Sequence, residues 1–376
     1  MRNILVLGAT GSIGSQTLNV ISKNADELNL IGISLYDDLT ELPQILKKFP
    51  NLKYVWALHP DAKKYPQVTF VNSLEELASL PCDLVVCAIV GFAAFKPLVS
   101  AIKTKHNVAL ANKECLVAAG DYLNALVKKN KVSIYPIDSE HSALYQCLKG
   151  EDIKSVKRLI ITASGGPFRD KKLSELKNVT VAEAIHHPTW KMGPKISIDS
   201  ATLVNKGLEV MEAHYLFNLP YAKISVVIQK ESIVHSLVEF VDGSIKAQLG
   251  VPNMEVPIQY ALFSGEHHLK TDAYLDFNKP LDLHFMPIDE KRFKAVKLAY
   301  EAGEKGLSYP LVFNSSNEVA VQSFREGEMA FCDIVPVIEK CLAKHTPCKV
   351  SSYTDIIRVD EEARELALSI IKEAKK

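Results

Sequence analysis

The chain has 376 residues, more than one hydrophobic core usually supports, so two or three domains are expected. Basic and acidic residues both number 44, and the zero net charge creates no overall field that would attract nucleic acid or an anionic membrane. With 47% hydrophobic and 23% charged residues, the composition is that of a globular protein. A charged ligand must therefore be recognised by a local group of residues.

Seven cysteines are spread along the chain without a C-x-x-C pair, which predicts reduced thiols instead of a disulfide framework. The first three residues lead directly into an apolar strand with no signal-peptide core, and no apolar run reaches ~18 residues. We therefore expect a cytoplasmic protein with no membrane partner.

The N-terminal part alternates strand-like and helix-like segments. A β-type run at 4–7 is followed by a glycine-rich turn at 8–14 and a helical pattern at 15–22. Further strand-like runs occupy 30–35, 53–58, 84–90, 107–111 and 132–137. This alternation predicts a Rossmann-like, doubly wound, mostly parallel sheet in a dinucleotide-binding domain over residues 1–150.

The pattern then changes to a central α+β catalytic domain over residues 151–279. Strand-like runs lie at 158–162, 224–228, 233–240 and 244–249. A hairpin turn at Asp242-Gly243 joins the last two, so the second sheet is at least partly antiparallel. A proline-bearing linker is expected at 280–290, and helical periodicity predicts a C-terminal helical domain over 291–376.

The turn after the first strand has the spacing Gly8-x-x-Gly11-x-x-Gly14. Glycines there let backbone amides and a helix N-terminus approach a pyrophosphate, which favours a nucleotide site over an incidental tight turn. Thr10 stands where the stricter fingerprint has its second glycine. After the second strand come Tyr36-Asp37-Asp38, and an acidic residue there suits a free ribose 2′-hydroxyl better than a 2′-phosphate.

Two carboxylates, Asp138 and Glu140, follow the last strand of this domain with Ser139 between them. If the strand stays extended they point the same way and repel each other. A divalent cation, a shared proton or plain solvent exposure would each relieve that repulsion. The residues alone leave these three alternatives open.

Polar residues follow other strands as well. Lys113 comes after the strand-like run at 107–111 and reaches the ligand crevice, or else forms a surface pair with Glu114. The small-residue turn at 163–167, which contains Ser164, could hold an oxyanion through its amides, or is a plain Gly-Pro turn.

Residues 186–195 combine two prolines, a glycine and Trp190 without any periodicity that would bury the tryptophan. We expect a lid whose aromatic side chain closes over a ligand, in preference to a core loop. Adjacent histidines rarely bind one ion, so a hydrogen-bonding role is expected for His187.

The next segment begins a predicted helix at Ser200, in which Asn205 and Glu209 share a face beside Lys206. A serine, an asparagine and a lysine near a helix N-terminus could hold a phosphate. An amphipathic surface helix is the alternative reading.

Taken in order, these motifs resemble the 1-deoxy-D-xylulose 5-phosphate reductoisomerase family over almost the full length. The resemblance is carried by the segments 8–14, 111–114, 138–141, 164–168, 187–193, 195–202 and 205–209. Later stretches, 247–254 and Asn317-Glu318, are similar too.

The resemblance implies a catalytic set in which three carboxylates hold one Mg²⁺ or Mn²⁺: Asp138, Glu140 and Glu209, joined by Lys113. The implied substrate-binding residues are Lys113, Ser139, Glu140, Ser164, His187, Trp190, Ser200, Asn205, Lys206 and Glu209. The implied cofactor-binding residues are Thr10, Gly11, Ser12, Ile13, Asn112, Glu114, Gly193 and Met254.

The implied reaction is metal-dependent isomerisation of 1-deoxy-D-xylulose 5-phosphate, a phosphorylated sugar, followed by NADPH-dependent reduction to 2-C-methyl-D-erythritol 4-phosphate, in a homodimer. Two departures from the family pattern stand out. Tyr36-Asp37-Asp38 replaces a small, a basic and an amide residue, so use of NADH is expected beside NADPH. Thr189 and Lys191 replace an asparagine and a serine of the lid, which predicts altered lid dynamics.

Two other readings compete with this one. A metal-independent NAD(P)-dependent dehydrogenase of another small phosphorylated substrate also fits a Rossmann-like domain followed by a mixed sheet. A nucleotide-sensing protein without catalysis fits less well, because a sensor needs no set of metal ligands.

Overall fold

The computed structural model describes residues 1–190, 192–268, 274–289 and 292–375. Their contacts divide into two compact units. Unit 1 comprises Met1–Asn112, Leu123–Tyr145 and Asn253–Tyr274, and unit 2 comprises Lys113–Tyr122, Gln146–Pro252 and Leu275–Lys376. Among the described residues no helix is long and apolar enough to cross a bilayer, and no disulfide joins any of the seven cysteines.

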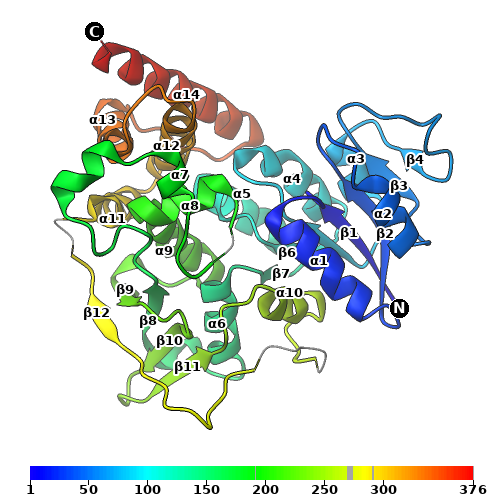
Figure 1. The fold of residues 1–376 in the computed structure, drawn as a ribbon, viewed down its shortest axis with the longest axis horizontal. Coiled ribbons are helices and arrows are strands. Elements are labelled where there is room, and N and C mark those ends of the chain that lie inside the picture. The colour runs from blue at the N-terminus through cyan, green and yellow to red at the C-terminus, as the bar shows by residue number, and fades with distance from the viewer. Residues whose placement is uncertain (191, 269–273, 290–291, 376) are drawn as a thin grey trace. The chain divides into compact units, whose positions relative to one another are not determined.

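Unit 1 is built on a seven-stranded parallel sheet with the order β4-β3-β2-β1-β5-β6-β7 (Figure 1). Its strands are β1 (Arg2–Leu7), β2 (Leu28–Ser34), β3 (Tyr54–Trp56), β4 (Thr69–Phe70), β5 (Leu84–Cys87), β6 (Asn107–Leu110) and β7 (Ile134–Pro136). The chain proceeds outward from β1 to β4 and then returns to β5 beside β1. The predicted doubly wound sheet is confirmed, and its order reverses between β1 and β5, where such sheets bind ligands.

Helices fill the crossovers of this sheet. They are α1 (Ser12–Lys23), α2 (Leu42–Lys48), α3 (Leu74–Ser79), α4 (Phe95–Lys103) and α5 (Lys113–Asn130), with the 3₁₀ turn η1 (Phe92–Ala94). Helix α6 (Ser139–Leu148) follows the last strand of the sheet, and α10 (Glu255–Leu262) comes from the later segment Asn253–Tyr274. The central strands are apolar on both faces: in β1, residues 4–7 are fully buried. A strand covered by helices on both sides needs such a continuous apolar run, which is why the sequence signal was clear.

Unit 2 contains a five-stranded mixed sheet with the order β11-β10-β8-β9-β12. Its strands are β8 (Val156–Ala163), β9 (Ile224–Gln229), β10 (Val234–Phe240), β11 (Ile245–Leu249) and β12 (Phe285–Pro287). Only the β8–β9 pair is parallel among these described pairings. The predicted hairpin is present: Gly243 has φ +88°, and the Asp242 carboxylate accepts a 2.9 Å hydrogen bond from the Ser244 amide.

The helices of unit 2 include a long C-terminal group, as the periodicity predicted. The elements are η2 (Ile153–Ser155), η3 (Leu173–Asn178), α7 (Val181–Ala184), α8 (Pro194–Thr202), α9 (Val204–Phe217), η4 (Tyr221–Lys223), α11 (Lys294–Lys305), α12 (Tyr309–Arg325), η5 (Phe331–Asp333), α13 (Ile334–Lys344) and α14 (Tyr353–Ala374). Helix α12 packs against both α13 and α14, and α11 packs against α9. A Cβ at Gly207 of α9 would lie 2.6 Å from the Ala299 Cβ of α11, so glycine permits this close packing.

The structure differs from the expected organisation in two places. Residues 253–274 group with unit 1, although the sequence assigned them to the central domain. Within the expected linker at 280–290, residues 285–287 form strand β12, which pairs antiparallel with β9 through Met286 and Ile228 at the edge of a sheet. The end of the predicted linker, residue 290, and the two ends of the predicted C-terminal domain, residues 291 and 376, lie outside the described residues. The division into domains expected from the sequence stays a prediction.

Candidate functional site

The glycine turn of unit 1 connects β1 to α1 at the reversal point of the sheet. Gly8 has φ +86°, and a Cβ there would lie 2.8 Å from the Ala88 carbonyl oxygen. A Cβ at Gly14 would lie 2.0 Å from the Gly8 carbonyl oxygen. Glycine at these two positions is therefore required by sterics, because any side chain would push α1 away from the strand. Gly11 is the N-cap of α1.

The predicted cofactor residues of this loop lie at the start of α1. Thr10 and Ser12 are exposed, while Ile13 packs against the apolar core of the unit. The first turn of α1 carries no acidic side chain, so the positive end of its dipole is not neutralised locally. This is a fitting site for an anion such as a pyrophosphate.

Other predicted residues of unit 1 play supporting parts. Asn112 is buried, and its amide donates hydrogen bonds of 2.9 Å to the Ile89 carbonyl and 2.7 Å to the Gly91 carbonyl, fixing the loop after β5. Met254 is the N-cap of α10 and packs against the core. The side chain of Asp38 is exposed, and a hydrogen bond from the Thr40 amide lowers the pKa of its carboxyl group.

The Asp138-Ser139-Glu140 segment also lies in unit 1, but not as an extended strand. Strand β7 ends at Pro136 and α6 begins at Ser139, so Glu140 is in the first turn of a helix. Strand alternation therefore does not place these carboxylates, yet one oxygen of Asp138 and one of Glu140 lie within 4.8 Å of each other, as the predicted convergence requires. The Ser139 hydroxyl donates a 2.6 Å hydrogen bond to the Glu140 carboxylate, and the Asp138 carboxylate lies 4.0 Å from His141 Nδ1.

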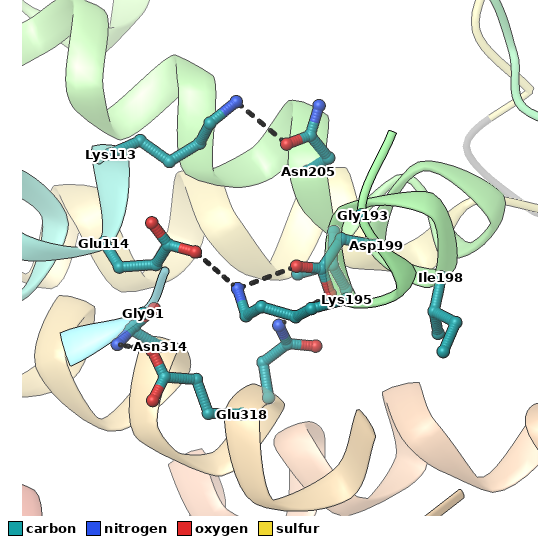
Figure 2. A network of polar contacts seen from close by, with 12 residues as sticks. Gly91, Lys113, Glu114, Gly193, Lys195, Ile198, Asp199, Asn205, Asn314 and Glu318 are labelled. Carbon is teal, nitrogen blue, oxygen red and sulfur yellow. Dashed lines mark hydrogen bonds and ion pairs between the residues drawn. The ribbon is translucent and has the colours of Figure 1, made fainter. Parts of the chain in front are cut away.

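Unit 2 contains a buried group of charged side chains around Glu209. The Lys113 ammonium donates to Asn205 Oδ1 at 2.9 Å (Figure 2). It also donates to Glu209 Oε1 at 3.1 Å. Asn205 and Lys206 each hydrogen-bond the same carboxylate. Lys113, Lys206 and Glu209 are at most 4% exposed. The predicted shared face of Asn205 and Glu209 is confirmed, and the amphipathic surface helix is excluded because this face is buried.

A second buried group in unit 2 centres on Lys195. Its ammonium lies 2.6 Å from Glu114 Oε1 and 2.8 Å from Asp199 Oδ2. The other Asp199 oxygen accepts a 2.8 Å hydrogen bond from the Asn317 amide. Burial alone would lower the pKa of Lys195, but the nearby carboxylates, Asp199 first among them, raise it above its usual value. Glu114, expected in a surface pair or at the cofactor, is engaged by Lys195.

Burial also acts on Glu114, and on its own it would raise the pKa of this carboxyl. The charges of Lys195 and Lys113 outweigh that effect and hold the pKa below its usual value. Glu114 is therefore a carboxylate facing an ammonium at neutral pH. Helix α8 begins at Pro194 with Gly193 as its N-cap, so Lys195 stands on a helix and not in the expected loop.

The expected lid residues lie close to Ser164. The backbone amides of Thr189 and Trp190 donate to His187 Nδ1 at 3.2 and 3.0 Å, so this nitrogen carries no proton. The proton is then on Nε2, which lies 3.0 Å from the Ser164 hydroxyl. Burial lowers the pKa of His187 to about 4. The predicted hydrogen-bonding role of His187 is confirmed, and Lys191 lies outside the described residues.

Trp190 is half-buried, and its ring lies 6.1 Å from the His235 ring of β10, at an interplanar angle of 54°. Burial lowers the pKa of His235 to about 4. The Trp190 side chain therefore packs near an uncharged imidazole ring, that of His235.

Ser200 does not begin a helix, contrary to the sequence prediction. It lies in the last turn of α8, and the chain turns at Leu203, with φ +57°, before α9 begins at Val204. The Ser164 turn packs against this end of α8, since a Cβ at Gly166 would lie 2.5 Å from the Ser200 carbonyl oxygen. Ser164 and Ser200 thus belong to neighbouring segments of unit 2.

No role was predicted for Lys195, Asp199 or Asn317, although all three lie in segments that carry the family resemblance. The spacing of Lys195 and Asp199, four residues apart, is a signal for an ion pair on one helix. Asn317 had no such signal, because its partner is 118 residues away.

A glycine-rich turn at the reversal point of a parallel sheet, together with a buried lysine and carboxylate group on a second unit, defines a two-unit α/β enzyme of the dinucleotide-dependent oxidoreductase class. Three family models match the chain. The model for 1-deoxy-D-xylulose 5-phosphate reductoisomerase matches residues 4–120, and two models for its C-terminal domains match residues 134–217 and 249–366. The chain belongs to the 1-deoxy-D-xylulose 5-phosphate reductoisomerase family.

Curated relatives with that name are similar over their full length. The chain is 45% identical to the protein of Halalkalibacterium halodurans over 382 residues, and 46% identical to that of a Geobacillus species over 386 residues. In both cases 99% of this chain and 100% of the relative are covered.

Solved structures of the family are similar as well. The Zymomonas mobilis reductoisomerase in complex with NADPH is 38% identical, has a TM-score of 0.90, and is matched over 98% of this chain and 99% of its own. A reductoisomerase in complex with NADPH, fosmidomycin and magnesium is 36% identical, with a TM-score of 0.94 and complete coverage of both chains.

Proposed function

We propose that the protein converts 1-deoxy-D-xylulose 5-phosphate to 2-C-methyl-D-erythritol 4-phosphate by metal-dependent isomerisation and NADPH-dependent reduction. The observation that carries the proposal is the buried group formed by Lys113, Asn205, Lys206 and Glu209 in a chain that belongs to this family over its full length. A metal-independent dehydrogenase of a phosphorylated substrate could use Asn205 and Lys206 for the phosphate, but it would have no use for Glu209 as a cation ligand.

The dinucleotide is assigned to unit 1. The Gly8 to Gly14 turn leaves room for a pyrophosphate at the uncapped start of α1, so the residues present fit such a cofactor. The proposed contacts come from Thr10, Gly11, Ser12, Ile13, Asn112, Glu114, Gly193 and Met254. NADPH, when bound, supplies the hydride, and the fixed turn orients it.

The proposed cation ligands are Asp138, Glu140 and Glu209. Three carboxylates are a hard oxygen donor set of the kind that Mg²⁺ and Mn²⁺ prefer. The cation, when bound, supplies positive charge that polarises the substrate carbonyl. Lys113, whose ammonium lies 3.1 Å from Glu209 Oε1, would hold a substrate oxygen, and Ser139 would turn its hydroxyl from Glu140 to the substrate.

The substrate phosphate is assigned to Ser164, Ser200, Asn205 and Lys206. Lys206 offers the charge and the serines offer hydroxyl donors, which suits a phosphate more than a carboxylate. His187 and Trp190 would close over the sugar. Since the proton of His187 faces Ser164, the histidine would orient that hydroxyl while excluding water.

A homodimer is also proposed, and the second sheet supports it. Large apolar side chains are exposed along its two edge strands and the segment before β12, namely Ile245, Leu249, Phe277, Leu281, Leu283, Phe285 and Met286. Exposed apolar edges of this kind mark interfaces between chains. Light scattering of the pure protein tests the assembly, and fractionation of cells tests the expected cytoplasmic location.

One assay tests the reaction. The pure protein is mixed with 1-deoxy-D-xylulose 5-phosphate, NADPH and Mg²⁺, and NADPH absorbance is followed with and without a chelator. We expect absorbance to fall only when free cation is present, with formation of the branched polyol phosphate. Turnover that persists in excess chelator would favour the metal-independent dehydrogenase, and absence of turnover would contradict the proposal.

A further inference from the structure

The Lys195 group lies beside the proposed catalytic group, and both involve the start of α5. Lys113 and Glu114 are the first two residues of that helix. Consecutive helical side chains point in directions about 100° apart, so the two cannot serve the same neighbour. In Figure 2 the Lys113 ammonium meets Asn205 of α9, whereas the Glu114 carboxylate meets Lys195 of α8.

This divergence means that the rotation of the first turn is fixed from two sides. If Glu114 lost its partner, the turn could rotate and carry the Lys113 ammonium away from Glu209. Lys195 in turn is held by Asp199, whose second oxygen is bound by Asn317 of α12. Asp199 is 1% exposed and Asn317 fully buried, so water does not compete for these contacts.

The orientation of the Asn317 side chain is unambiguous chemically. Its amide nitrogen donates to a carboxylate, and the flipped rotamer would place an oxygen against that negative charge. Asn317 therefore fixes the rotamer of Asp199, and Asp199 fixes the position of the Lys195 ammonium relative to the Glu114 carboxylate.

We propose that Asn317, Asp199 and Lys195 form a positioning chain that sets the start of α5 through Glu114, and thereby places Lys113 for the reaction. The inference rests on the proposed function, because placing Lys113 matters only if that lysine contacts substrate. None of the three residues touches the reacting groups in this assignment; they act through Glu114.

The same helix provides a matched control. Ser315 of α12 is also fully buried, and it also donates one hydrogen bond to a buried carboxylate, that of Asp360 on α14. Asp360 pairs with Arg364, which also binds Glu318. Asn317→Ala and Ser315→Ala thus each remove one side-chain donor from one helix, but only the first faces Asp199.

The test compares these two variants by thermal unfolding, by kcat/KM for 1-deoxy-D-xylulose 5-phosphate, and by amide exchange of peptides covering residues 113–122. We expect similar falls in melting temperature. Only Asn317→Ala should lower kcat/KM, by about 10-fold, because small misplacements of a reacting group are costly. Only Asn317→Ala should speed exchange in the first turns of α5.

Equal kinetic and exchange behaviour of the two variants would overturn the positioning chain. If the unmodified protein does not turn over the substrate, the proposed function is wrong. The comparison of amide exchange still tests whether the positioning chain sets the start of α5. A second pair repeats the test nearer to the site: Lys195→Met should lose about 100-fold in kcat/KM, and Lys195→Arg, which keeps the charge, should recover part of it. Should Lys195→Met fail to fold, the Asn317→Ala comparison decides.

Discussion

The two units build their candidate sites in different ways. In unit 1 the nucleotide turn depends on backbone geometry, since side chains at Gly8 or Gly14 would collide with carbonyl oxygens 2.8 and 2.0 Å away. In unit 2 the site depends on buried charge, with Lys113, Lys206 and Lys195 held against carboxylates. The nucleotide turn of unit 1 tolerates exposed, variable side chains. The charged group of unit 2 is destabilised when one partner is removed, because the opposite charge then stays buried without a partner.

The largest expected effect is on unit 2. Glu209→Gln keeps the shape of the side chain but removes the charge that Lys113 and Lys206 share, and also a proposed cation ligand. We expect turnover to fall by about 10³-fold or more, the size typical of losing a charge-stabilising group. NADPH affinity, measured by fluorescence titration, should change little, because the cofactor is assigned mainly to unit 1.

Glu239→Gln is the control for that substitution. Glu239 also pairs with two cations, Lys157 and Arg158, but the side chains of these two partners are exposed, and Glu239 belongs to no proposed site. It should leave turnover intact. A Glu209→Gln variant that retains activity would remove Glu209 from the proposed ligands.

The second effect tests the steric character of unit 1. Gly8→Ala and Gly150→Ala both place a side chain at positive φ, +86° and +81°, so both should lose about 1–2 kcal/mol of stability from backbone strain, and Gly8→Ala should lose more because of its steric clash. Only at Gly8 would the Cβ meet backbone, whereas a Cβ at Gly150 finds nothing within 4 Å. We expect NADPH to bind about 10- to 100-fold more weakly to Gly8→Ala alone. Equal NADPH affinities of the two variants would mean that the glycine turn can accommodate a side chain at position 8 without disturbing cofactor binding.

These two kinds of site also differ in how far sequence predicts them. The strand, glycine turn and helix of unit 1 are local, because spacing and sterics act within a few residues, and the parallel sheet followed from continuous apolar runs. Glu140 was misplaced because the chain leaves the strand at Pro136 and starts α6 two residues after Ile137. No local pattern could join Asn317 to Asp199, since only the packing of α12 on α8 brings them together.

A third test concerns the neutral His187 of unit 2. Its folded pKa of about 4 lies below the ordinary value of 6.5, so the unfolded chain binds more protons between these values. Its contribution to stability is therefore complete above pH 6.5 and is lost as the pH falls from about 6.5 to about 4. Protonation of Nδ1 would also break the hydrogen bonds from Thr189 and Trp190.

Denaturant unfolding between pH 4 and 7 measures this slope, which for one group is at most about 1.4 kcal/mol per pH unit. His187→Gln should reduce the slope by up to that amount. The pKa of His235 is lowered as well, so this histidine should maintain part of the slope in the His187→Gln variant. An unaltered slope in His187→Gln would show that the histidine is not held neutral by the fold.

The smallest effect is expected at the exposed rim of unit 1, where Asp37 follows β2. NADPH is the proposed cofactor, yet a carboxylate here would repel a 2′-phosphate, so Asp37→Asn should raise the ratio of kcat/KM for NADPH over NADH. An exposed charge contributes at most about 1 kcal/mol, so we expect a change of roughly 2- to 5-fold that shrinks as salt is added. Asp61 is another exposed aspartate of unit 1, and Asp61→Asn should leave this ratio unchanged.

A strong NADPH preference that Asp37→Asn does not change would mean that the 2′-phosphate lies beyond the reach of this carboxylate. Cofactor choice would then depend on the backbone of the turn, like the rest of the unit 1 site.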